Sequence, residues 1–282
     1  TGDPTFRFQS MNEIDVCELL KTDYEENRTL RWLESPYADI QNLALHLLYR
    51  HGYSDISKLL RHTYEHSPYK MVRYTSLALL QKLNDENFRA VLPQALTDSY
   101  EFIRRCSVRM MQQVGLDEYV YPQIKAYVED HLSKRVAFNI TLGLHVFREE
   151  AVNEAIERVM AETHVIFDKE KRKKSLYEAS RKRSMQEELL DKNQNEQSRM
   201  LYSNFLRNYN AHACVDGLLK LLVDEDESEM LKRSVLDALA WFTHSYRKTD
   251  ILQVCDRIRK DKEVSTALRD EANRTYYRLK NF

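Results

Sequence analysis

Apolar residues return along the chain in one helical pattern at an almost fixed interval. The pattern is anchored on Ile40, Val72, Ile103 and Val136, which are separated by 32, 31 and 33 residues. Apolar or small residues follow each anchor three, four, seven and eight positions later, which is the spacing of one buried face of an α-helix. A helix that recurs at this interval predicts a chain of repeated helical pairs. Cys106 and Asn139 fall on this face and are expected in the interior.

The same pattern returns late in the chain, at Leu231 and more weakly at Leu268. Shorter amphipathic segments lie between the anchored helices and predict the other helix of each pair. They span about 54–66, 85–97, 117–130, 211–223 and 246–260. We call the shorter segment the first helix of its pair and the anchored segment the second.

Polar and flexible residues mark the ends of the second helices. The predicted N-caps stand five residues before their anchors, and two of them are followed by a proline that suits the first helical position. These residues are Ser35, Ser67, Asp98 and Asp226, with Pro36 and Pro68. Gly52, Asn84 and Gly115 come twelve residues after the first three anchors and tolerate the left-handed conformation that closes a helix.

A basic residue follows the anchor directly in several repeats, at Arg73, Arg104, Lys232 and Arg269. The segments SPYKMVRYTSLALLQKLN and DSYEFIRRCSVRMMQQVG resemble the second helix of a HEAT repeat, with its polar first turn, Val-Arg pair, small residue and closing Leu pair. The resemblance covers about 36–147 well and 211–282 moderately. It implies an all-α, HEAT-like α-α superhelix, a right-handed solenoid of antiparallel helix pairs whose curved inner face holds a partner.

The predicted organisation is a single α-solenoid domain over residues 1–282. Its parts are N-terminal capping helices at 1–34, regular repeats at 35–147, an elongated basic helical insertion at 148–196 and C-terminal repeats at 197–282. The insertion is expected because a unit anchored near Ile166 would place Glu170, Lys173 and Lys174 on the buried face. A degenerate repeat follows at 198–209, where Met200 and Leu201 compete as the anchor.

Composition narrows the possible functions. The 43 basic and 44 acidic residues give a net charge of −1, without the global positive field of a dedicated nucleic-acid or membrane binder. Five glycines exclude a Gly-rich phosphate loop. No run of 18 apolar residues occurs, and the four cysteines are widely spaced, which favours a reducing, cytoplasmic location. The chain begins at Thr1, so the cytosolic domain of a membrane-anchored protein stays an alternative.

The exposed face of the second helices is the predicted contact surface. It lies two, six and nine positions after the anchor, and aromatic, amide and Arg side chains there suit a protein or peptide partner. The predicted contact residues are Tyr74, Arg105, Arg109, Phe138, His46, Tyr49, Gln112 and His145. The alternative is an ordinary solvated face.

A basic cluster stands in the predicted insertion. It consists of Lys169, Lys171, Arg172, Lys173, Lys174, Arg181, Lys182 and Arg183. Such a cluster favours either a solvated protruding helix or contacts with an acidic partner, nucleic acid or an anionic membrane surface.

No pattern of residues indicates catalysis, a cofactor or a metal. His62, Glu65 and His66 match the HxxEH arrangement of zinc enzymes, but they fall in the last turn of a short helix without a recognisable third ligand. We therefore expect a non-catalytic scaffold or adaptor. The alternatives are nucleic-acid binding, as in DNA glycosylases that resemble HEAT arrays, or the soluble domain of a membrane-associated assembly. Those enzymes use Trp and Asp on the concave face, whereas Trp32 and Trp241 lie outside the exposed positions here.

Overall fold

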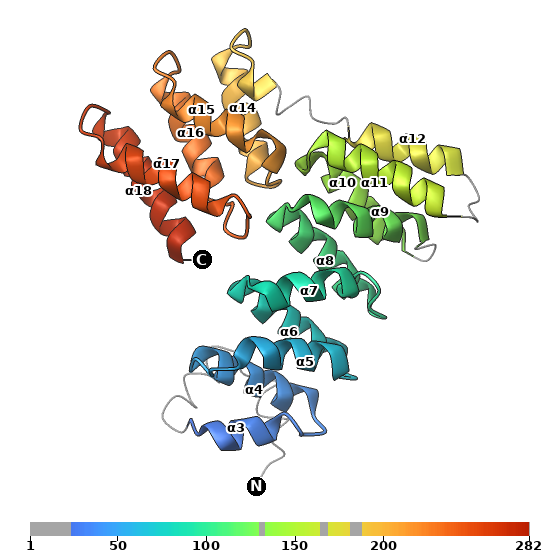
Figure 1. The fold of residues 1–282 in the computed structure, drawn as a ribbon. Coiled ribbons are helices and arrows are strands. Elements are labelled where there is room, and N and C mark those ends of the chain that lie inside the picture. The colour runs from blue at the N-terminus through green and yellow to red at the C-terminus, as the bar shows by residue number, and fades with distance from the viewer. Residues whose placement is uncertain (1–23, 130–132, 164–168, 181–187, 282) are drawn as a thin grey trace. The chain divides into compact units, whose positions relative to one another are not determined.

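The protein is helical throughout the residues that its structure describes. The computed structural model describes residues 24–129, 133–163, 169–180 and 188–281, and every regular element in them is an α-helix or a short 3-10 helix (Figure 1). The predicted all-α class is therefore confirmed. None of these helices is long and apolar enough to cross a membrane.

The chain divides into two compact units, Thr1–Gln94 and Ala95–Phe282. The boundary falls at the end of a first helix, where the repeat pattern predicts no interruption.

Unit 1 contains five helices in its described residues, the last of which ends at the unit boundary. They are α3 (Glu26–Trp32), α4 (Ala38–Arg50), α5 (Ile56–His66), α6 (Lys70–Leu83) and α7 (Glu86–Ala95). The second helix α6 contacts both its own first helix, α5, and the preceding second helix, α4. Of the predicted capping helices at 1–34, α3 lies in the described part, and residues 1–23 lie outside it.

Unit 2 contains the remaining helices. They are α8 (Glu101–Val114), η1 (Asp117–Tyr119), α9 (Val120–Glu129), α10 (Lys134–Gly143), η2 (Leu144–Val146), α11 (Glu149–Glu162), α12 (Lys169–Ser180), α14 (Glu196–Leu206), η3 (His212–Cys214), α15 (Val215–Val223), α16 (Glu229–Leu239), α17 (Lys248–Lys260) and α18 (Thr266–Asn281). The second helices again contact one another in sequence, as α8 with α10, α10 with α12, α14 with α16, and α16 with α18. First helices pack on their own partners, as α17 does on α18.

The predicted buried face agrees with the observed core. In the first four repeats, the positions four, seven and eight after the anchor are buried. The position five after the anchor is also buried in most repeats, at Leu45, Leu77, Val108 and Leu236, so the buried face is wider than the predicted one. Cys106 and Asn139, predicted to be interior, are only half-buried because they lie at the edge of this wider apolar face.

The second helices begin later than the sequence predicts. Their N-caps are Tyr37, Tyr69, Tyr100 and Ser228. Three of the predicted caps instead accept a hydrogen bond from the backbone N–H two residues on, in a turn that precedes the helix. These bonds join Ser35 to Tyr37, Ser67 to Tyr69 and Asp98 to Tyr100. Pro36 and Pro68 therefore lie in these turns, before the first helical residues Ala38 and Lys70.

In three repeats, a hydrogen bond from the residue directly after the anchor links the turn to the helix. The side chain of this residue donates to the backbone carbonyl oxygen six residues earlier. The pairs are Gln41 with Ser35 (2.6 Å), Arg73 with Ser67 (3.2 Å) and Arg104 with Asp98 (2.8 Å). Glutamine and arginine thus have the same structural role in successive repeats, and this role explains why a long donor recurs at that position.

The predicted helix closures are confirmed. Gly52, Asn84 and Gly115 have φ angles of 68°, 51° and 80°, the left-handed conformation that ends a helix. Gly115 is further constrained because a Cβ atom there would lie 1.9 Å from the imidazole of His212.

The predicted insertion, 148–196, is described in part. The helix α11 has 14 residues, and α12 spans Lys169–Ser180 between the segments 164–168 and 181–187, which lie outside the described residues. The helix α11 packs on α9, and α12 packs on α10 and α11, as a further helical pair does. The predicted elongation stays a prediction, and the described part of α12 buries Leu176, Ala179 and Ser180 in a register that the apolar pattern does not reveal.

Candidate binding sites

The predicted contact residues fall in both units. His46, Tyr49 and Tyr74 belong to unit 1, where all three are half-buried. The ammonium group of Lys82 lies 5.8 Å from the centroid of the Tyr49 ring.

Unit 2 brings three of the predicted contact residues into one pocket. Arg105, Arg109 and Gln112 of α8 share a cavity of about 350 Å³ with residues of α10, η2 and the segment after α14. The other lining residues are Gln113, Asn139, Leu142, Val146, Asn208, Tyr209 and Asn210. His145, also predicted, is packed edge-on against Tyr209 with ring centroids 5.2 Å apart. Phe138 does not line the pocket and is 62% exposed.

Gln112 holds the pocket together through hydrogen bonds within the protein. Its Nε2 atom donates to the Gln123 side chain at 3.2 Å and to the Asn139 carbonyl at 3.0 Å. A Cβ atom on Gly143 would lie 2.1 Å from the Gln112 amide carbon, so α10 approaches this side chain closely. The amide donor of Gln112 is therefore used within the fold, and its contribution to a partner surface is smaller than the sequence predicts.

Much of the basic segment contacts the protein itself. Arg172 donates to the carbonyl oxygens of Tyr127 and Val128, at 3.2 and 2.6 Å, at the end of α9. Lys169 donates to the carbonyl of Met160, and Lys173 forms an ion pair with Glu157 at 2.9 Å. Cations near helix C-termini complement the helix dipole, which accounts for the positions of Arg172 and Lys169.

Lys171 and Lys174 are the exposed basic residues of α12, and Lys174 lies 3.9 Å from Glu178. Arg181, Lys182 and Arg183 lie outside the described residues. A contact of this segment with nucleic acid or an anionic surface stays a prediction, supported in α12 mainly by these two lysines.

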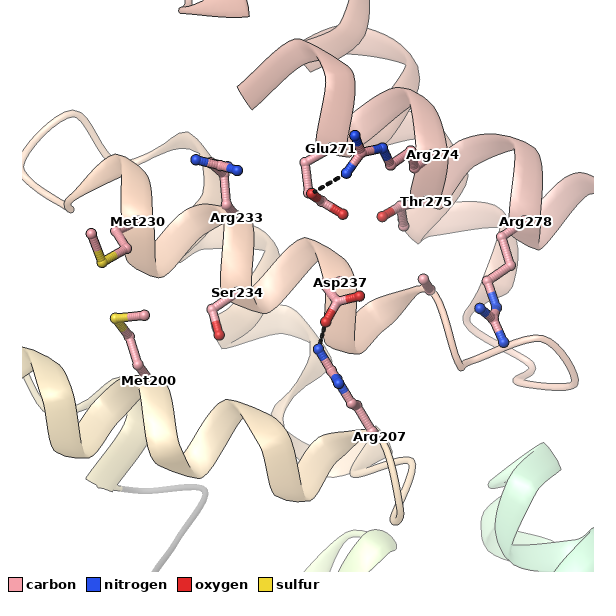
Figure 2. Close-up of a pocket in the computed structure, with 11 residues that line it drawn as sticks. Met200, Arg207, Met230, Arg233, Ser234, Asp237, Glu271, Arg274, Thr275 and Arg278 are labelled. Atoms are coloured by element: carbon pink, nitrogen blue, oxygen red, sulfur yellow. Dashed lines mark hydrogen bonds and ion pairs between the residues drawn. The ribbon is translucent and has the colours of Figure 1, made fainter. Parts of the chain in front are cut away.

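A second cavity, which the sequence reasoning missed, crosses three successive second helices of unit 2. This groove of about 720 Å³ lies over α14, α16 and α18 (Figure 2). We call it the C-terminal groove. Its lining residues are Met200, Arg207, Met230, Arg233, Ser234, Asp237, Ala240, Glu271, Arg274, Thr275 and Arg278.

Methionines lie at one end of the C-terminal groove. Met200 and Met230 come from α14 and α16 and point toward one another in Figure 2. The Met230 side chain is 60% exposed. An exposed, flexible thioether provides apolar contact area that adapts to the shape of a partner.

Positive charge exceeds negative charge in the C-terminal groove, where four arginines face two carboxylates. Arg207 pairs with Asp237, and Arg274 lies 3.4 Å from Glu271. The Arg278 guanidinium lies 3.6 Å from the centroid of the Trp241 ring. Arg233 is exposed and forms no ion pair with the residues that the structure describes. The groove therefore presents a net positive charge beside an apolar end.

Several residues of this groove stand at positions of the repeat pattern from which the sequence could have indicated them. The positions two and six after Leu231 are Arg233 and Asp237, and the position six after Leu268 is Arg274. These are the positions that define the predicted contact face in the first four repeats. The repeat pattern predicts that Trp241 lies outside the exposed positions. Its side chain is nevertheless 43% exposed, because the residue follows the last turn of α16.

The remaining histidine and cysteine candidates for metal binding or reactivity have surroundings that are typical of structural residues. His66 Nδ1 lies 2.8 Å from the carbonyl oxygen of His62, and the two rings stack 4.2 Å apart. Within the described residues, no group of three or more His, Cys, Asp or Glu side chains is placed to hold a metal ion. Burial raises the pKa of Cys214 and of Cys255 to about 12, so both thiols are protonated at neutral pH.

Comparison with known proteins identifies no relative. No model of a protein family matches the chain, and no curated protein is similar to it. The resemblance to HEAT repeats therefore rests on the residues quoted above.

Proposed function

We propose that this chain is a non-catalytic, HEAT-like solenoid scaffold that binds an acidic segment of a partner protein in the C-terminal groove. The recurring helical pairs and the sequential contacts between second helices support the solenoid. A cytoplasmic location remains part of this proposal.

The observation that carries the proposal is the combination of charge and apolar surface in one groove. Three second helices contribute side chains, so an extended or helical segment has a continuous surface to follow. Arg233 supplies a charge that is not neutralised within the described residues, and Met230 supplies exposed apolar surface beside it. A segment with carboxylates next to an apolar side chain complements both features.

Peptide-display selection tests the proposal because it does not require an identified partner. A random 12-residue library selected on the wild-type protein is expected to become enriched in acidic peptides that contain apolar residues. Arg233→Glu is expected to weaken the binding of the selected peptides by about tenfold, since the same position then repels carboxylates. Arg257→Glu is the matched control, because Arg257 is an exposed arginine of α17 outside the groove.

The salt dependence of binding gives an independent measurement. Affinity for a selected peptide should fall between low and physiological ionic strength, since the contacts involve exposed charges. Selected peptides without acidic enrichment, or equal losses in Arg233→Glu and Arg257→Glu, would contradict the proposal.

A further inference from the structure

The pocket that α8, α10 and the segment after α14 enclose contains basic residues and no carboxylate. Its lining residues include Arg105 and Arg109 but no Asp or Glu. The other polar lining residues are neutral glutamines, asparagines and a tyrosine. This composition differs from that of the C-terminal groove, where carboxylates pair with two of the arginines.

The two arginines stand on one side of α8. Positions four apart on a helix are neighbours one turn away, so the two guanidinium groups can reach one ligand. Arg109 is exposed, and Arg105 is half-buried with an Nε atom that has no hydrogen-bond partner in the described structure. Neither side chain forms an ion pair with the described residues, whereas Arg148 of the same unit pairs with Asp117.

Contacts within the protein fix the walls around these arginines. Gln112 is held by two hydrogen bonds, as described above. The Asn210 amide donates to the Gln113 carbonyl at 3.4 Å, and Tyr209 packs against His145. A pocket whose walls are positioned in advance loses little conformational entropy when a ligand binds.

We propose that this pocket binds a phosphomonoester dianion. Two positive charges without a lining carboxylate match a doubly charged group better than a single carboxylate, which would leave one arginine uncompensated. The guanidinium geometry also suits bidentate hydrogen bonds to phosphate oxygens. The cavity volume of about 350 Å³ holds a phosphate together with a small organic group. The phosphate belongs either to a free metabolite or to a phosphorylated side chain.

Calorimetric titration with defined probes tests this assignment. The probes are inorganic phosphate, O-phosphoserine, a phosphoserine peptide and its unphosphorylated form, with acetate as the carboxylate control. The phosphate probes are expected to bind the wild-type protein. Their affinity should fall by about tenfold in Arg109→Gln and further in the Arg105→Gln/Arg109→Gln variant. Arg135→Gln is the matched control, because Arg135 is an exposed arginine of α10 outside the pocket.

The protonation state of the probe provides a second readout. The second pKa of a phosphomonoester is about 6, so binding should be tighter at pH 7.5 than at pH 5.5.

Arg109 is exposed, so a loss of affinity in Arg109→Gln with unchanged thermal unfolding separates ligand binding from a folding defect.

The probes also distinguish the source of the phosphate. Equal affinity for O-phosphoserine and the phosphopeptide assigns the site to a small molecule, whereas tighter phosphopeptide binding assigns it to a modified protein. The proposal is overturned if no phosphate probe binds, if acetate binds as tightly as phosphate, or if Arg135→Gln weakens binding equally. A single-stranded oligonucleotide is titrated as a further probe, and its tighter binding through the same two arginines would overturn the proposal in favour of nucleic-acid recognition.

Discussion

His212 is a buried polar side chain whose two ring nitrogens both have partners. Nε2 lies 3.0 Å from the Gln112 carbonyl oxygen, and Nδ1 lies 3.0 Å from the Ser245 hydroxyl. Because a carbonyl only accepts, Nε2 carries the proton of the neutral ring and Nδ1 accepts from the hydroxyl. A second proton on the ring would remove the acceptor that Ser245 uses. The environment therefore favours the neutral imidazole.

This environment predicts a loss of stability in mild acid. Burial lowers the pKa of His212 to about 4, from 6.5 in an exposed histidine, with a smaller lowering from Arg247. Between these two values the unfolded chain binds a proton that the folded chain does not. The free energy of unfolding should therefore fall, by on the order of 3 kcal/mol, as the pH decreases from about 6.5 to about 4.

Urea unfolding of the wild type and of His212→Gln across this pH range measures the effect. The variant is expected to be less stable at pH 7.5 but to show a shallower pH dependence. His244 serves as an internal reference, since burial also lowers its pKa and it is present in both proteins. Parallel pH profiles for the two proteins would show that His212 does not contribute.

A buried ion pair explains why the apolar repeat pattern is degenerate in α14. Arg199 and Glu227 have side chains only 6% and 7% exposed, and they form two hydrogen bonds of 2.8 and 2.7 Å. The Arg199 Nε atom also donates to the Leu189 carbonyl at 2.8 Å. Arg199 stands 32 residues before Leu231, at the repeat interval. It occupies the anchor position for which Met200 and Leu201 competed in the sequence.

Removal of one member of this pair should destabilise the protein strongly. Arg199→Leu leaves the Glu227 carboxylate buried without its partner, which should cost about 3–5 kcal/mol. Arg199→Leu combined with Glu227→Leu should cost less, because no uncompensated charge remains in the interior. Chemical denaturation of the single and double variants measures both effects.

Lys58→Ala is the control for the buried pair, since it breaks an ion pair with Asp55 that is open to solvent. Its free energy of unfolding should stay close to that of the wild type. A double variant as unstable as Arg199→Leu would show that packing around the arginine, and not its charge, holds α14 in place.

At the scale of helices, the sequence predicted the positions of most elements but not all of their ends. Local periodicity locates α4, α6, α8 and α16 because their anchors are apolar. The N-caps were placed too early because Ser35 and Ser67 close a turn before the helix, with the same hydrogen-bonding chemistry as a cap. Periodicity failed where a charged residue is buried, since the partner of Arg199 stands 28 residues away.

At the scale of the whole chain, long-range contacts exceed what a repeat predicts. A repeat pattern identifies neighbours about one interval apart. In unit 2, however, His212 contacts Gln112 across 100 residues, and the Tyr246 backbone N–H donates to the Val114 carbonyl at 2.9 Å. These contacts help to form the pocket around Arg105 and Arg109. Its lining by Asn208 and Tyr209 could not be inferred from the sequence, although its two arginines could.

One short segment contributes to both proposed sites. Arg207 lines the C-terminal groove, and the next three residues, 208–210, line the phosphate pocket. Neighbouring residues are joined by peptide bonds, so a shift of the backbone at 208–210 is expected to shift Arg207 as well. A ligand in the pocket should therefore alter the affinity of the groove for its peptide.

The two ligands are consequently expected to act as effectors of each other. If O-phosphoserine changes the dissociation constant of a selected peptide by some factor, the peptide must change that of O-phosphoserine by the same factor. Titration of each ligand at saturating and zero concentrations of the other measures this factor, and a value of one would show that the segment transmits nothing. A value different from one is the result expected if residues 207–210 couple the two proposed sites.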